Sequence, residues 1–139
     1  MFKRKILSVL LIVLATFCLF SCGGGTVECS ILETNENRVV ISVIDTDGKA
    51  TVTNCMEYLK GNTDFSYKIS GGMVTEINGK ANTADFSGCW LLYTSDTDMA
   101  NAEWGTIEYN GETLGSAILG AESLIVEKDE IYVWEYVTF

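Results

Sequence analysis

The chain has no histidine and no proline among its 139 residues. The absence of histidine removes the commonest general base of enzymes and a frequent ligand of zinc. The cysteines do not compensate, because no pair has C-x-x-C spacing and none has an evident cationic neighbour that would activate it as a nucleophile. No serine lies in a nucleophile-elbow pattern. We therefore expect a noncatalytic protein with no metal and no cofactor.

Positive charge is also scarce. The sequence has 9 lysines and arginines against 19 aspartates and glutamates, a formal net charge of −10. Tight binding of nucleic acid needs clustered Lys and Arg side chains that displace counterions from the phosphates. Here the cations beyond residue 21 are scattered: Arg38, Lys49, Lys60, Lys68, Lys80 and Lys128. We therefore expect no nucleic-acid partner, and the acidity is typical of a soluble surface domain.

Two acidic stretches have oxygen-bearing side chains at alternate positions, as calcium-binding loops do: DTDG at residues 45–48 and SDTD at residues 95–98. Neither continues into the longer loop with a final glutamate that calcium sites of this kind need. The interpretation we favour is an ordinary turn in which Asp bonds the local backbone.

The N-terminal stretch MFKRKILSVLLIVLATFCLFSCGGG is typical of an export signal. Cations at residues 3–5 precede an apolar run from Ile6 to Phe20 that is interrupted only by Ser8 and Thr16. This pattern predicts a secretory signal peptide. A single transmembrane anchor is the alternative, although a span needs about 20 apolar residues.

The end of that run, LFSC at residues 19–22, resembles the lipobox of bacterial lipoproteins. The resemblance implies cleavage before Cys22 and a diacylglyceryl group on its sulfur. Two acyl chains anchor a protein stably in a membrane. We therefore expect a signal peptide at residues 1–21, a lipidated cysteine and glycine linker at residues 22–25, and an extracytoplasmic domain at residues 26–139 anchored to the bacterial cell membrane.

Three cysteines, Cys29, Cys55 and Cys89, remain in the domain. An extracytoplasmic location permits a disulfide. Cys55 and Cys89 form the best pair, because each lies in an element that is expected to face the core. The alternative is that the cysteines are buried free thiols that only pack.

The first part of the domain predicts a hairpin followed by a helix. β-Branched runs at residues 26–34 and 38–44 flank Asn-Glu-Asn and are typical of two paired strands. In TVTNCMEYLKG, apolar side chains then recur at helical spacing on one face: Val52, Cys55, Met56 and Leu59. Thr51 or Thr53 can cap the start of this short helix, and Gly61 marks its expected end.

The rest of the domain is dominated by strand patterns. Asn78-Gly79 and Asn110-Gly111 are strong hairpin signals, because a type I′ turn needs positive φ at both central residues. Strands are predicted at residues 65–70, 73–77, 89–95 and 130–139, a second hairpin around residues 106–115, and an acidic loop at residues 96–104. Without proline to interrupt them, these elements predict an α+β domain in which one short helix packs on a mixed or antiparallel sheet with β-hairpins.

Several stretches together resemble the transcobalamin-like C-terminal domain, a family of unassigned function common on bacterial surfaces. They are TVTNCMEYLKG, GGMVTEINGK, CWLLYTSD and SAILGAESLIVEKDEIYVWEY, and the similarity spans about residues 38–139. The shared features are the helix, an Ile-Asn-Gly hairpin at residues 77–79, a strand with Trp90, a second Asn-Gly turn, and a closing strand with Trp134 and Tyr136. The resemblance implies a β-grasp-like, ligand-binding domain.

The same resemblance implies one class of ligand. In eukaryotic cobalamin carriers, the equivalent domain closes over a corrinoid that is held against a separate helical barrel. The present sequence shows no such barrel. A corrinoid or a related ligand would therefore need a second protein to complete its site.

Aromatic residues are the candidates for ligand binding. Along the last strand, Tyr132, Trp134 and Tyr136 fall on one face and apolar residues on the other, which predicts a central strand covered on both sides. These rings could form a platform for a planar ligand, a sugar or a peptide, or they could pack within the core.

Three further aromatic residues belong to this candidate set. In CWLLYTS, Trp90 and Tyr93 point to opposite faces, so at least one of them is expected in the core. Trp104 follows the acidic loop without apolar neighbours, and it is either a lid on the end of the core or an exposed contact residue.

Two functions are compatible with these patterns. The first is a noncatalytic, lipid-anchored cell-surface domain that binds a small or extended ligand through aromatic side chains, with a corrinoid as one ligand by resemblance. The second is a protein-interaction or structural module of the cell envelope, without a small-molecule ligand. Tryptophans gathered around one concavity would favour the first function, and a flat surface poor in aromatics would favour the second.

Overall fold

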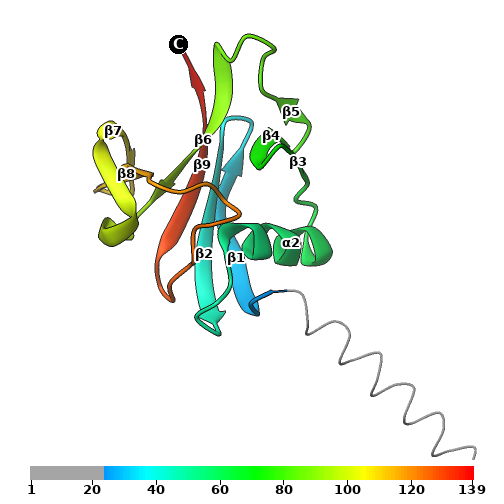
Figure 1. Ribbon diagram of the computed structural model, residues 1–139, viewed down its shortest axis with the longest axis vertical. Helices are drawn as coiled ribbons and strands as arrows, with labels where there is room; N and C mark the ends of the chain where they lie inside the picture. The colour runs from blue at the N-terminus through cyan, green and yellow to red at the C-terminus, as the bar shows by residue number, and fades with distance from the viewer. Residues whose placement is uncertain (1–23) are drawn as a thin grey trace, which may run out of the picture.

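A six-stranded antiparallel sheet forms the centre of the domain, with strand order β1-β2-β9-β6-β8-β7, and three short strands form a second sheet, β3-β4-β5 (Figure 1). The computed structural model describes residues 24–139, and the predicted signal peptide and Cys22 lie outside that range. No helix within the described range is long and apolar enough to cross a membrane.

The elements are β1 (Val27–Asn35), β2 (Arg38–Thr46), α2 (Val52–Asn62), β3 (Tyr67–Ser70), β4 (Met73–Ile77), β5 (Lys80–Ala81), β6 (Gly88–Thr94), the 3-10 helix η1 (Thr97–Met99), β7 (Ala100–Tyr109), β8 (Glu112–Ala117) and β9 (Ile131–Thr138). The expected α+β class is confirmed.

Helix α2 begins where its sequence predicts a cap. Thr51 Oγ1 accepts a hydrogen bond from the backbone N–H of Asn54, and Asn54 Oδ1 accepts one from the N–H of Thr51, which together form a capping box. The four apolar residues of the predicted stripe are all buried. The expected end at Gly61 is wrong, because the helix continues beyond it. Thr63 closes the helix instead by donating its backbone N–H and its hydroxyl to the carbonyl of Leu59.

The predicted turns are confirmed. Asn78 and Gly79 have φ of 48° and 83°, and Asn110 and Gly111 have φ of 50° and 83°. These positive angles are the ones that a type I′ hairpin turn requires, and asparagine and glycine adopt them most readily. The first hairpin also forms as expected, because β1 pairs with β2 in antiparallel register.

Strand β9 is the central strand of the large sheet, as its two apolar faces predict. It pairs with β2 on one side and with β6 on the other, so that Val133 stands beside both Val40 and Tyr93. Tyr132 and Trp134 belong to the core on the face that carries α2, whereas Val133 belongs to a second cluster on the opposite face. The alternation predicted for β9 is therefore confirmed.

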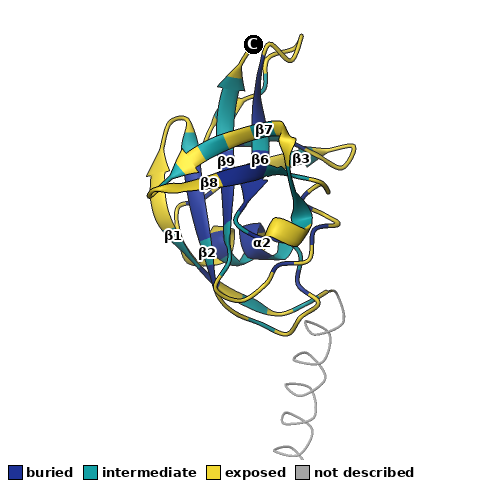
Figure 2. Cartoon of the chain, turned by 90° about the vertical axis from the view of Figure 1, so that its left-hand side faces the viewer, coloured by how far each residue is buried: buried dark blue, intermediate teal, exposed yellow. Residues whose placement is uncertain are grey.

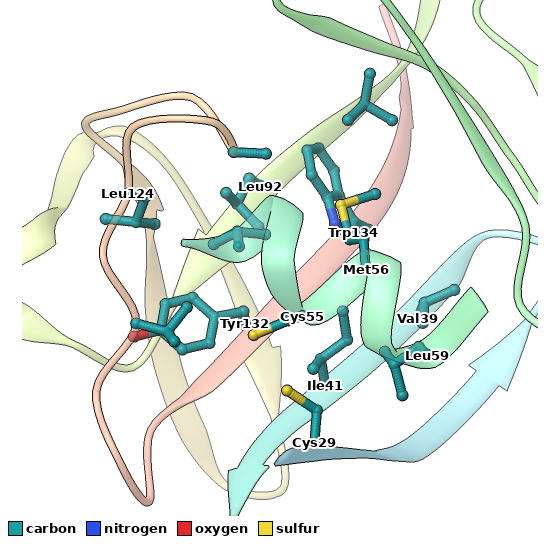
Figure 3. Close-up of a cluster of buried hydrophobic side chains, with 14 of the residues drawn as sticks. Cys29, Val39, Ile41, Cys55, Met56, Leu59, Leu92, Leu124, Tyr132 and Trp134 are labelled. Carbon is teal, nitrogen blue, oxygen red and sulfur yellow. The ribbon is translucent and has the colours of Figure 1, made fainter. Parts of the chain in front are cut away.

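The front face of the large sheet is covered by α2 and the small sheet, which lie on the same side (Figure 1). The main core lies here, and in it Met56 and Leu59 of the helix and Ile41 of β2 have no exposed surface (Figure 3). Val74 and Ile77 extend the same core into the small sheet. Each large aliphatic side chain removed from water in this way contributes roughly 1.5–3 kcal/mol to stability.

The back face of the sheet is covered by the β7–β8 hairpin. Strand β8 pairs with β6 only at Tyr93↔Ser116 and Thr94↔Gly115, near the end of β6. Figure 2 shows β7 and β8 running across β6 and β9. Leu114 of β8 packs there in a smaller buried cluster with residues from three other strands: Val40, Tyr93 and Val133.

A hydrogen bond from Arg38, which is also ion-paired with Glu135, joins this hairpin to the far side of the sheet. Arg38 of β2 donates hydrogen bonds of 2.6 and 3.1 Å to the carboxylate of Glu135, and a third of 3.3 Å to the backbone oxygen of Glu108 in β7. The hydrogen bond with Glu135 raises the pKa of Arg38, so the guanidinium stays charged. Strand β7 thus reaches β2 although β9, β6 and β8 lie between them in the sheet order. The large sheet therefore curls back on itself.

The prediction of an acidic loop at residues 96–104 is wrong for residues 100–104, which belong to a strand. After η1, β7 begins at Ala100 and includes Trp104. The pairing of β7 with β8 shifts between Asn101 and Thr106, and Gly105 in this interval has φ of 136°. The irregularity interrupts the two-residue alternation, which explains why the sequence pattern does not indicate a strand there.

The connection between β8 and β9 packs against the N-terminus of α2. Its carbonyl groups at Ala121 and Leu124 accept hydrogen bonds, both of 3.0 Å, from the backbone N–H groups of Thr53 and Val52. The first N–H groups of a helix have no partner within the helix, so the connection satisfies two of them. It also adds buried side chains to the main core: Ala121, Leu124 and Val126.

Candidate functional site

A hollow of about 430 Å³ opens between the small sheet, strand β6 and the segment that leaves β8. Its walls are residues 71–74 of the β3–β4 turn and β4, residues 90–92 of β6, and residues 116–121, together with Trp134 of β9. We call it the tryptophan hollow, because two of the three tryptophans of the chain, Trp90 and Trp134, line it. Three other hollows, of about 290, 520 and 420 Å³, are lined by strand ends and turns and contain no tryptophan.

Trp90 is held rigidly in this wall. Its indole Nε1 donates a hydrogen bond of 2.8 Å to the backbone oxygen of Lys80, and its backbone N–H donates one of 2.9 Å to Asn82 Oδ1. The Trp90 ring meets the Tyr136 ring edge to face, with centroids 5.4 Å apart and an interplanar angle of 76°. Aromatic pairs prefer this arrangement, because the positive ring edge faces the negative ring face.

Tyr136 supports Trp90 from outside the tryptophan hollow. Its hydroxyl donates a 3.3 Å hydrogen bond to the backbone oxygen of Ala81, and Lys80 Nζ lies 4.1 Å from the centre of its ring. A cation at this distance from an aromatic face is attracted by the ring quadrupole. Tyr136 therefore fixes the position of a lining residue instead of lining the hollow itself.

Trp134 lies beneath α2 near Met56, and its indole Nε1 has no hydrogen-bond partner among residues 24–139 (Figure 3). Trp90 and Trp134 are each only 4% exposed, so their neighbours cover most of both lining side chains. A buried N–H without a partner costs roughly 1–3 kcal/mol.

The rim of the tryptophan hollow is apolar and exposed. Met73, Ile118 and Leu119 all line the hollow, and they keep 49%, 39% and 43% of their surface in water. None of the lining residues carries a charge, although the chain is strongly acidic overall. Exposed apolar side chains that surround a concavity are typical of binding sites.

The other three predicted ligand-binding residues lie elsewhere. Tyr132 is a core residue of the front face with 1% exposure, and its hydroxyl accepts a 2.8 Å hydrogen bond from the N–H of Glu127. Burial raises the pKa of Tyr132 to about 12. Tyr93 is buried on the back face with Val133 and Leu114. Trp104 is 64% exposed on β7, so it does not close the end of the core as a lid would.

The cysteines are arranged differently from the expected pairing. Cys89 precedes Trp90 in β6 and so points to the back face, whereas Cys55 lies under α2 on the front face. The sheet therefore separates Cys55 from Cys89, and the neighbour of Cys55 is Cys29 of β1 (Figure 3). A hydrogen bond with Cys29, together with burial, raises the pKa of Cys55. All three side chains are buried free thiols in the structure.

The acidic stretches bond their own backbone. Asp47 Oδ1 accepts a 2.9 Å hydrogen bond from the N–H of Lys49, and Asp47 Oδ2 accepts one of 3.0 Å from Thr26. The pKa of Asp47 is lowered, and the main cause is the hydrogen bond that its carboxylate accepts from the backbone N–H of Thr26. Asp96 accepts in the same way from the N–H of Asp98. No group of three or more His, Cys, Asp or Glu residues in the described part of the chain is placed to hold a metal ion.

Two walls of the tryptophan hollow were missed by the sequence reasoning. The Gly71–Gly72 pair predicts only the end of a strand, and residues 116–121 carry apolar side chains without a clear period. The sequence feature that could have indicated these walls is that each comes at or after the end of a predicted strand: Gly71–Gly72 follow β3, and residues 116–121 come at the end of β8 and beyond it. Comparison of the chain with protein-family models, with curated proteins and with solved structures gives no match.

Proposed function

We propose that this protein is a noncatalytic, lipid-anchored domain of a bacterial cell surface that binds a small ligand in the tryptophan hollow. The observation that carries the proposal is the meeting of Trp90 and Trp134 in one concavity with an exposed apolar rim. A lining without charges favours a ligand that is uncharged where it enters, with an apolar or aromatic face. A volume of about 430 Å³ falls within the range of small-molecule sites.

The resemblance to the transcobalamin-like C-terminal domain supports the same proposal at a finer level. A hairpin, a helix across the sheet and further strands occur here in the order that a β-grasp-like domain has. A corrinoid remains one candidate ligand by that resemblance. Its macrocycle is too broad for this hollow to enclose, so a corrinoid would enter only by an edge or a side group, and a second protein would have to cover the rest.

Trp104 favours the second candidate function, an interaction or structural module of the envelope. It is 64% exposed and lies on β7, an edge strand of the large sheet. An exposed tryptophan on a strand edge is a suitable anchor for a protein partner. The two functions therefore predict different tryptophans at the binding surface, which makes them separable by experiment.

Fluorescence titration of single-site variants tests the site. The full-length protein in mild detergent is titrated with cobalamin, short oligosaccharides and apolar peptides. Binding in the hollow is expected to shift the emission of the wild type, and to shift that of Trp104→Phe more, because this variant lacks the exposed tryptophan that does not respond. Trp90→Phe with Trp134→Phe is expected to abolish the shift, because only the exposed Trp104 still emits. A shift that survives in the double variant and disappears in Trp104→Phe would support the interaction module instead.

Two matched leucine variants control for changes in folding. Leu119 lies on the rim of the hollow, whereas Leu32 is a similarly exposed leucine on β1 outside it. Leu119→Ser is expected to weaken binding about tenfold through lost apolar contact, and Leu32→Ser is expected to leave it unchanged. Equal effects of the two substitutions would exclude the hollow as the site.

The anchor is tested separately from the ligand. Cells that produce the full-length protein are supplied with labelled palmitate. Cys22→Ala is expected to abolish labelling, because it removes the sulfur that accepts the lipid, while the matched variant Cys18→Ala is expected to keep it. Labelling of Cys22→Ala, or loss of label in both variants, would contradict the proposed lipid anchor.

A further inference from the structure

Two cysteines from distant parts of the chain face each other in the main core. Cys29 lies on β1 and is 5% exposed, and Cys55 lies on α2 and is 1% exposed. Figure 3 shows their sulfur atoms turned toward each other between the strand and the helix. The Cys29 thiol is also the largest cause that raises the pKa of Cys55, which agrees with this proximity.

The strand that carries Cys29 lies at the edge of the large sheet. β1 is an edge strand that pairs only with β2, and its register shifts between Glu28 and Cys29. Its second half, beyond Ile31, is exposed (Figure 2). Edge strands with irregular pairing open more easily than central strands. A covalent link at Cys29 would tie this strand directly to α2.

We propose that Cys29 and Cys55 form a disulfide in the mature protein, an assignment that goes beyond the proposed binding function. The oxidant is a second disulfide, either of a thiol oxidase or of a small molecule. The thiolate of one cysteine attacks a sulfur of that disulfide and releases one thiol. The other cysteine then attacks the mixed disulfide and releases the second thiol. Two protein thiols are thereby oxidised, and one external disulfide is reduced to two thiols.

The burial of both sulfurs determines when the link can form. The attacking species is the thiolate, and the raised pKa of Cys55 makes the thiolate scarce in the folded domain. An external disulfide also cannot reach sulfur atoms beneath α2. The link therefore forms while α2 is still open, and the closed core then protects it. Cys89 lies across the sheet and is a built-in control, because it should remain a thiol.

Differential alkylation tests the assignment. The full-length protein from bacterial envelopes is denatured in acid, alkylated with iodoacetamide, reduced and labelled with N-ethylmaleimide. Mass spectrometry is expected to find N-ethylmaleimide on Cys29 and Cys55 and carbamidomethyl on Cys89. Carbamidomethyl on both Cys29 and Cys55, or a peptide that links Cys89 to either of them, overturns the proposal.

Thermal unfolding of the native protein, and of protein that was reduced with dithiothreitol in urea and refolded with the reductant present, gives an independent readout. Reduction is expected to lower the Tm of the wild type by about 10 °C, because the link closes a long loop in the unfolded chain. Cys89→Ala should show the same decrease, whereas Cys29→Ala with Cys55→Ala should be insensitive to the reductant. An equal Tm with and without dithiothreitol in both the wild type and Cys89→Ala overturns the proposal, whether or not the double variant folds.

Discussion

Replacing Leu59 with alanine is expected to lower the free energy of unfolding by about 3 kcal/mol. The side chain of Leu59 has no exposed surface and packs between α2 and the large sheet. Its truncation removes buried methyl groups and leaves a cavity that the rigid sheet cannot fill, and such changes typically cost about 2–5 kcal/mol. Urea unfolding monitored by circular dichroism measures the difference.

The adjacent residue gives a matched control. Lys60 lies on the same turn of α2 but is exposed. Lys60→Ala also introduces alanine, and lysine and alanine have similar helix propensities. The substitution is therefore expected to change the free energy of unfolding by less than about 0.5 kcal/mol. Equal losses in Leu59→Ala and Lys60→Ala would mean that α2 does not pack on the sheet through the face described above.

Alkaline pH is expected to destabilise the domain through Tyr132. Burial raises its pKa to about 12 in the folded protein, whereas a tyrosine in the unfolded chain titrates near 10. Between these values the unfolded chain has already released the proton that the folded protein still holds. The unfolded state then binds fewer protons, so stability falls as pH rises. This contribution is fully present below pH 10 and decreases by about 2 kcal/mol by pH 12.

Tyr132→Phe isolates this contribution from those of other groups. Phenylalanine fills the same space but does not titrate, and it loses the hydrogen bond that the Tyr132 hydroxyl accepts from Glu127 N–H. Urea unfolding at pH 9, 10, 11 and 12 is therefore expected to show a steeper decrease for the wild type than for the variant. Parallel decreases would mean that Tyr132 is accessible to water in the folded state.

The features that sequence reasoning predicted correctly depend on near neighbours in the chain. The capping of α2 at Thr51, the turns at Asn78 and Asn110 and the alternation along β9 each follow from a few consecutive residues. In these segments the conformation that the local sequence prefers is also the one that the folded domain requires. The α+β class follows in turn from the order of such segments.

The features that it missed depend on strand pairing between distant segments. Trp90 and Trp134 meet because β6 pairs with β9, and no local pattern shows which strands become neighbours. The choice of Cys89 as the partner of Cys55 failed for the same reason. Alternation placed Cys89 on a buried face, but the pairing of the strands decides which face lies under α2. The candidate site could therefore be predicted as a set of aromatic residues, but not as a particular hollow.

The position of β9 in the sheet has a consequence for the order of folding. This central strand follows all other described strands in the chain, and its partners β2 and β6 have no direct pairing with each other. The sheet cannot close until β9 inserts between them, so the decisive contacts join segments of large sequence separation. Such topologies fold slowly, because the entropy of closing long loops is lost before the contacts form. A chain emerging from the ribosome or crossing a membrane N-terminus first would stay open until residues 131–138 arrive, which suits the export that we propose.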